Sequence, residues 1–347
     1  MAERIPDKVH LVGSIALDSV EDVFRTAGTL LGRRLKRVPD GEPGGRRLWI
    51  SWQYPLLRAN AYLRMDPANM GQAGMFPKLK IADGVKPQDI RFGELGYARE
   101  ARASYQDFLA ARTKGELPAK ARFQVSLPTP MAVIVPFTVA SDTPAIEQAY
   151  EKAMLEEVAR LVRAIPHQDL AIQWDVCIEM VIWDGQLADR YRSEGSSKPE
   201  IIARLKRLGA SVPNDVELGF HLCYGDLDAK HFVDPIDSGK MVELANALAA
   251  EVPRPINFLH MPVPIARNDD AFFAPMKGLK LGKETELYLG LVHNDGADGI
   301  KAREAAASKY VPSYGIATEC GIARQRTPEL VTQLLKLHAA GSREPAA

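Results

Sequence analysis

A histidine and two cysteines are the residues of this chain best suited to metal chemistry. His221 and Cys223 lie two positions apart at the end of a predicted strand, and Cys320 follows a much later one. Residues two apart in a strand face the same side, so His221 and Cys223 can reach one ion. Imidazole and thiolate are ligands that zinc prefers. The pattern predicts a Zn²⁺ site formed by His221, Cys223 and Cys320. The alternative is that the histidine is buried in the core and the cysteines pack there as small apolar residues. We expect Cys177 to be such a packing residue.

Other reactive side chains also follow predicted strands. We expect Asp175 to bind an ammonium group or to accept a proton, although a carboxylate there could also cap a turn. His260 is expected to be a further metal ligand and His293 a catalytic acid, and either could instead be a hydrogen-bonded residue at the rim. Residues expected to bind substrate lie at the ends of the first four strands: Gly13, Ser14, Asp40, Ser126 and Gln173.

Short apolar runs that alternate with amphipathic segments predict the elements that position these residues. The eight expected strands are Val9–Ser14, Leu35–Pro39, Ala121–Leu127, Leu170–Asp175, Val216–His221, Pro255–His260, Glu286–His293 and Ser313–Thr318. Helix start signals occur at Ser19, Thr143-Pro144 and Thr327-Pro328. Since parallel strands need helical crossovers, the alternation predicts an α/β fold, a (β/α)8 TIM barrel. An open doubly wound sheet is the alternative, but its glycine fingerprint is missing after the first strand.

The connection between the second and third strands is unusually long. Residues from about 49 to 117 contain two helical patterns and a hairpin signal around Asp83-Gly84. A connection of this length is usually functional, so we expect a lid or side subdomain. A shorter insertion from Trp183 to Ser197 follows the fourth strand. No second core is evident, so residues 1–347 are expected to form one domain.

The composition is that of a globular protein with no preference for charged partners. Hydrophobic residues make up 46% and charged residues 25%, and 44 Lys and Arg balance 44 Asp and Glu. This balance argues against a nucleic-acid or membrane-surface partner. The polar start of the chain, the lack of a long apolar run and the three cysteines together favour the cytoplasm. The sequence leaves open whether the chain forms a homo-oligomer.

Four motifs resemble one enzyme family. Val12-Gly13-Ser14 is similar to its Ile-Gly-Ser, Gln173-Trp174-Asp175 to its Gln-Ile-Asp, His221-Leu222-Cys223-Tyr224 to its His-Met-Cys-Tyr, and Glu319-Cys320-Gly321-Ile322 with Arg326 to its Asp-Cys-Gly-Leu and downstream Arg. The chain thus resembles the C-terminal catalytic barrel of cobalamin-independent methionine synthase, in the superfamily that includes uroporphyrinogen decarboxylase. The resemblance implies zinc on His221, Cys223 and Cys320, and an Asp175 that holds a substrate amino group.

The chain also departs from that family. The family's Asp-Glu-Pro-Ala reads Asp175-Val176-Cys177-Ile178, and its glutamate ligand after the sixth strand is missing near His260. The implied activity is therefore a zinc-dependent methyl or alkyl transfer to a small thiol. The sequence does not identify the thiol or the alkyl donor. A zinc-dependent lyase or hydrolase, and a non-catalytic zinc-containing barrel that binds a small molecule, are the alternatives.

Overall fold

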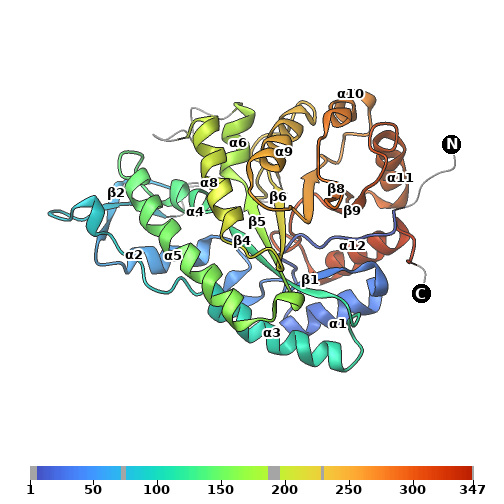
Figure 1. The fold of residues 1–347 in the computed structure, drawn as a ribbon, viewed down its shortest axis with the longest axis horizontal. Helices are drawn as coiled ribbons and strands as arrows, with labels where there is room; N and C mark the ends of the chain where they lie inside the picture. The colour runs from blue at the N-terminus through green and yellow to red at the C-terminus, as the bar shows by residue number, and fades with distance from the viewer. Residues whose placement is uncertain (1–5, 72–75, 187–195, 228–229, 346–347) are drawn as a thin grey trace.

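A curled parallel sheet organises the protein. The computed structural model describes residues 6–71, 76–186, 196–227 and 230–345. Within them, seven parallel strands follow the order of the chain, and helices surround the sheet (Figure 1). The strands are β1 (Arg37–Pro39), β4 (Arg122–Pro128), β5 (Leu170–Val176), β6 (Glu217–Leu222), β7 (Phe258–Pro262), β8 (Glu286–Val292) and β9 (Gly315–Thr318). The fold is α/β and TIM-barrel-like. A strand order without a reversal rules out the doubly wound alternative.

The first expected strand, Val9–Ser14, does not form as predicted. Its segment runs between the two edge strands, where Val9 makes single parallel bridges to Leu35 and Ile316, and Ile15 makes one to Ile322. These pairings are separated along the chain, so no continuous ladder develops. The segment therefore lies between the edge strands β1 and β9, where an additional strand would close the barrel, but it bonds to its neighbours only at isolated points.

The predicted helix starts are confirmed. α1 (Val20–Leu31) begins after Ser19, whose side chain accepts a hydrogen bond from the Asp22 amide. α5 (Thr143–Ala164) begins at Thr143, and Thr327 caps α12 (Pro328–Ala340) through the Leu330 amide. The other helices are α2 (Tyr54–Arg58), α3 (Tyr97–Thr113), α4 (Pro130–Phe137), α6 (Ile178–Asp184), α8 (Lys198–Ala210), α9 (Gly239–Glu251), α10 (Asp270–Phe273) and α11 (Gly296–Ala307). In the described ranges no helix is long and apolar enough to span a membrane.

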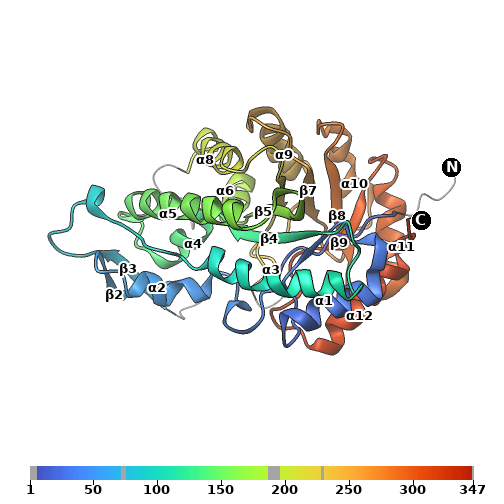
Figure 2. The same ribbon diagram turned by 60° about the horizontal axis from the view of Figure 1, so that its bottom comes forward.

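The long connection between β1 and β4 contains α2, a hairpin and α3. The hairpin pairs β2 (Leu63–Met70) with β3 (Pro77–Ile81) in antiparallel fashion, far from the chain ends (Figures 1 and 2). Residues 71–76 connect β2 to β3, so the hairpin position predicted around Asp83-Gly84 is wrong. That dipeptide does form a turn, but the turn follows β3 instead of joining the paired strands. Most of the insertion from Trp183 to Ser197 lies outside the described residues.

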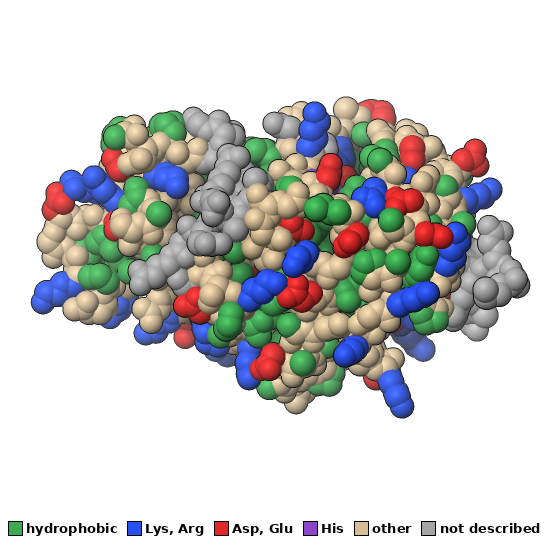
Figure 3. Space-filling view, turned by 90° about the horizontal axis from the view of Figure 1, so that it is seen from above, with side chains coloured by type: hydrophobic (Ala, Val, Ile, Leu, Met, Phe, Trp, Pro, Cys, Tyr) green, Lys and Arg blue, Asp and Glu red, His purple; other side chains and the backbone are tan. Residues whose placement is uncertain are grey.

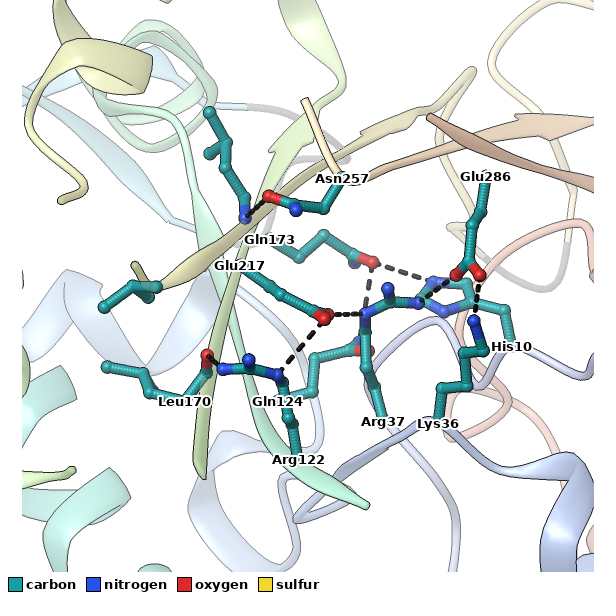
Figure 4. Close-up of polar contacts among 12 residues, drawn as sticks. His10, Lys36, Arg37, Arg122, Gln124, Leu170, Gln173, Glu217, Asn257 and Glu286 are labelled. Atoms are coloured by element: carbon teal, nitrogen blue, oxygen red, sulfur yellow. Dashed lines mark hydrogen bonds and ion pairs between the residues drawn. The ribbon is translucent and has the colours of Figure 1, made fainter. Parts of the chain in front are cut away.

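The interior of the sheet is polar at its N-terminal end. Arg37, Glu217 and Glu286 are the first residues of β1, β6 and β8, and Arg37 reaches between the two carboxylates (Figure 4). The Arg37 guanidinium also lies 4.2 Å from the centre of the Phe258 ring. This network is at the end of the strands opposite the expected site, where side chains of a barrel serve stability.

Candidate metal centre

The three predicted zinc ligands meet at the C-terminal end of the sheet. One donor atom from each of His221, Cys223 and Cys320 lies within 4.8 Å of the others, and all three residues are buried. The two sulfur atoms are 3.6 Å apart. Two thiolates on one tetrahedral zinc, each about 2.3 Å from it, are separated by about 3.8 Å. The sulfur spacing therefore fits a shared ion.

Local backbone geometry fixes the two cysteines. Gly225 has a positive φ of 89°, and its amide donates to the Cys223 sulfur at 3.3 Å. A Cβ at Gly225 would lie 2.7 Å from the Phe232 ring, so this turn requires glycine. On the other side, the Thr318 hydroxyl donates to the Cys320 carbonyl oxygen at 2.8 Å. Both sulfur atoms are thus held by short segments directly after strands.

Without a metal, the surroundings of the cluster keep its two thiols protonated. A hydrogen bond with Cys177 is the largest effect that raises the pKa of the Cys223 thiol, and a hydrogen bond with Cys223 does the same for the pKa of Cys320. A divalent cation reverses this tendency, because a coordinating thiol is deprotonated outright. Arg324, with Nη2 3.8 Å from the Cys320 sulfur, adds positive charge beside the pair.

His221 contributes an unused donor atom. Its Nδ1 is hydrogen-bonded to His260 at 2.7 Å, while its Nε2 is buried without a hydrogen-bond partner. A buried polar atom without a partner is costly and calls for an explanation, such as an ion. The residues present therefore fit zinc, with the Nε2 atom of His221 and two sulfur atoms as ligands.

The metal cluster lines a pocket that also contains Asp175, the predicted proton acceptor or ammonium-binding residue. Asp175, Gly13, Ser14 and Arg324 belong to the same lining. Gln173 lies behind Asp175 and donates to its Oδ1 at 2.8 Å. Burial raises the pKa of Asp175 to about 7, although the hydrogen bonds from Gln173 and Trp49 act in the opposite direction. Asp175 is therefore able to exchange a proton near neutral pH.

Glu42 is a functional candidate that the sequence leaves undecided, because turn chemistry in a loop rich in glycine and proline accounts equally well for an acidic residue there. It lines the metal pocket, and its pKa is raised to about 8 by burial and by the charges of Asp175 and Asp40. Glu42 and Trp49 both have positive φ, at 53° and 55°. Non-glycine residues rarely adopt this conformation, and such strain clusters at functional sites. No sequence signal marks this geometry.

A second pocket adjoins the first and shares Glu42 and Trp49 with it. Asp40 and Ser126, two predicted substrate-binding residues, line this second pocket with Trp52. The carboxylate of Asp40 is already engaged, because Oδ2 accepts from Arg46 at 2.8 Å and from Ser104 at 2.7 Å. Asp40 thus shapes the pocket wall.

Besides Gln173, two predicted site residues, His260 and His293, line neither pocket. His260 is completely buried behind His221. His293 has its Nε2 2.9 Å from the Val263 carbonyl and 3.1 Å from the Gly290 carbonyl, and burial lowers its pKa to about 4. Neither histidine ring presents a free nitrogen to the metal pocket. The prediction failed because the position of a residue at a strand end does not determine the orientation of its ring.

Arg324 is a residue that sequence reasoning missed. Its Nε donates to the Asp226 backbone oxygen at 2.7 Å, and its Nη2 lies 3.2 Å from the Asp226 carboxylate. The guanidinium is also 5.9 Å from the centre of the Trp49 ring. Its spacing of four residues from Cys320 was the only available signal. Arg324 therefore links the metal cluster to the wall formed by Trp49.

Comparison with known proteins gives likenesses of structure alone. No protein-family model and no curated protein matches the chain. A B12-independent methionine synthase from Shewanella sp., solved with selenomethionine, matches with a TM-score of 0.59 and 15% identity, covering 97% of each chain. A Listeria monocytogenes chain assigned as a vitamin-B12-independent methionine synthase gives 0.56 and 14%, covering 98% of this chain and 99% of its own. A Methanosarcina mazei methyltransferase gives 0.52 and 14%, over 98% and 95%. The chain therefore has the fold of B12-independent methionine synthases and of this methyltransferase.

Proposed function

We propose that the protein is a zinc-dependent alkyltransferase that moves an alkyl group, most simply methyl, to the sulfur of a small thiol. The observation that carries the proposal is the cluster of two sulfur atoms and an unpartnered His221 nitrogen on a pocket wall. Three protein ligands leave the fourth position of a tetrahedral zinc for substrate. Zinc bound there would keep a substrate sulfur deprotonated and nucleophilic at neutral pH.

The chain's own residues supply binding and proton transfer. Asp175 and Glu42 line the pocket with raised pKa values, so either is suited to take the proton that the thiol loses. When one of them is ionised it also suits a substrate ammonium group. We assign the alkyl donor to the adjoining pocket, which shares Glu42 and Trp49 with the metal pocket. The sulfur then forms a bond to the alkyl carbon as the bond from that carbon to its leaving group breaks.

Two further observations support small-molecule substrates. The selenomethionine in the Shewanella structure is the selenium form of a methylated thiol product. On the face seen in Figure 3, Lys and Arg side chains are interspersed with Asp and Glu, without a broad region of one sign. Such a surface offers no electrostatic attraction to nucleic acid or to an anionic membrane.

Cobalt substitution tests whether the metal centre accepts a thiol. In protein loaded with Co²⁺, we expect 2-aminoethanethiol to increase the sulfur-to-cobalt charge-transfer absorption, because its sulfur enters the open position. Ethanolamine, the oxygen analogue, should leave the spectrum unchanged. No response to any small thiol, or unfolding when a chelator removes the metal, would show a structural site and contradict the proposal. Products formed equally with and without thiol would favour a lyase or hydrolase.

Substitution of Asp175 with asparagine is expected to affect amino-thiols selectively. Loss of a charged hydrogen-bond partner costs roughly 1.5–3 kcal/mol, so binding of 2-aminoethanethiol should weaken at least tenfold. Ethanethiol, which has no ammonium group, should bind nearly as before. Titration of the cobalt spectrum measures both. Asp22→Asn, on the exposed side of α1, is the control. Equal weakening of both thiols would rule out an ammonium site at Asp175.

A further inference from the structure

His260 lies directly beside the proposed metal ligand His221. The two residues are register partners on β7 and β6, with ring centres 4.7 Å apart and the two Nδ1 atoms at 2.7 Å. Two nitrogen atoms at this distance share one proton in a hydrogen bond. One ring must therefore donate through Nδ1 and the other must accept.

The second nitrogen of His260 decides the direction of this bond. Its Nε2 lies 3.0 Å from the Thr318 carbonyl oxygen, which only accepts, so Nε2 carries a hydrogen. The ring is completely buried and its two hydrogen-bond partners, His221 and the Thr318 carbonyl, carry no negative charge, so a buried imidazolium there would be unpaired; His260 is therefore neutral and has no second hydrogen. Nδ1 of His260 is consequently the acceptor, and Nδ1 of His221 is the donor.

The same reasoning fixes the state of His221. A neutral His221 that donates through Nδ1 has a bare lone pair on Nε2, the buried atom without a hydrogen-bond partner. The opposite tautomer would place a hydrogen on Nε2 and block coordination. Both nitrogens of His260 are occupied, so this residue is in no position to act as the fourth ligand.

We propose that His260 is a positioning residue that sets the tautomer and orientation of His221, so that Nε2 faces Cys223 and Cys320 before a metal arrives. Thr318 extends the relay to the third ligand, since its carbonyl accepts from His260 and its hydroxyl donates to the Cys320 carbonyl. The relay thus connects β6, β7 and β9. The inference rests on the metal centre of the proposed function, and not on alkyl transfer.

Two substitutions of His260 separate the relay from simple packing. In His260→Gln, the amide oxygen can accept from His221 and the amide nitrogen can donate to Thr318, so zinc affinity should stay within about threefold of wild type. His260→Leu fills space but offers neither group, and should weaken zinc at least tenfold, as is typical when the partner of a ligand histidine is lost. Competition with a chromophoric chelator measures affinity. His338→Gln, at a buried histidine on α12 bonded to the Leu334 carbonyl, is the control and should match wild type.

The tautomers themselves provide a readout that needs no variant to fold and no activity. In metal-free wild type, long-range ¹H–¹⁵N spectra of the imidazole rings should show His221 protonated on Nδ1 and His260 on Nε2. The reverse assignment, or equal zinc affinity in the Leu and Gln variants, would overturn the relay. A protein that binds zinc with these tautomers but never alkylates a thiol would leave the relay standing and contradict the proposed function.

Discussion

Replacing Cys320 with serine is expected to remove most of the zinc from the protein. A serine hydroxyl is not deprotonated near neutral pH and is a harder ligand than a thiolate. Structural zinc sites with four protein ligands bind with about 10–16 kcal/mol, which is about 2.5–4 kcal/mol per ligand. Loss of one of the three protein ligands here should therefore cost about 3 kcal/mol, or more than a hundredfold in affinity. Elemental analysis after dialysis against a weak chelator should find about one zinc per chain in wild type and almost none in the variant.

Cys177 offers a matched control for this experiment. It is buried in the same group of cysteines, but the set of donor atoms that can share one ion does not include it. Cys177→Ala should therefore retain its zinc. Retention of zinc by Cys320→Ser at the wild-type level would contradict the ligand assignment, as would the lack of zinc in reconstituted wild type.

The fold was largely readable from the sequence because parallel strands joined by helices leave a periodic pattern. Seven of the eight expected strands are present, with bounds shifted by up to three residues. The bounds differ because the hydropathy of a segment does not show where its backbone hydrogen bonds end. The segment Val9–Ser14 was misjudged because an apolar run of the right length does not reveal that its partners bond to it at isolated points. The hairpin was misplaced because the turn at Asp83-Gly84 follows β3, and turn residues alone do not show whether a turn joins paired strands.

The metal ligands could be predicted from the sequence for a different reason: histidine and cysteine are the residue types that bind zinc. His221, Cys223 and Cys320 converge as the pattern predicted. His260 and His293 were equally plausible by type, but the orientation of a histidine ring depends on hydrogen bonds to carbonyl groups that no sequence shows. Glu42 stayed undecided between a functional and a turn residue, because its positive φ and its neighbouring carboxylates exist only in the folded chain.

The second large effect is expected far from the metal, at the opposite end of the strands. Arg37→Met should lower the free energy of unfolding by about 3 kcal/mol, because it removes the buried cation that pairs with two half-buried carboxylates. Arg37 is 4% exposed and is hydrogen-bonded to Glu217 and, at 2.9 Å, to Glu286. We expect the lower end of the usual range, since Lys36 and Lys8 also contact Glu286. Urea unfolding at pH 7 measures the loss, and Arg25→Met, which removes the exposed pair with Asp22, should stay within about 0.5 kcal/mol of wild type.

The pH dependence identifies the interaction responsible. Burial alone would raise the pKa of Glu286, but the charges of Arg37, Lys36 and Lys8 outweigh it and lower the value to about 2. An unfolded glutamate titrates near about 4.3. Since the folded pKa is the lower one, this stabilisation is complete above about pH 4.3 and is lost as the pH falls towards 2. The difference between wild type and Arg37→Met should therefore be constant from pH 7 to 5 and shrink below it. A difference independent of pH would mean that Arg37 acts through its packing on Phe258, and not through its charge.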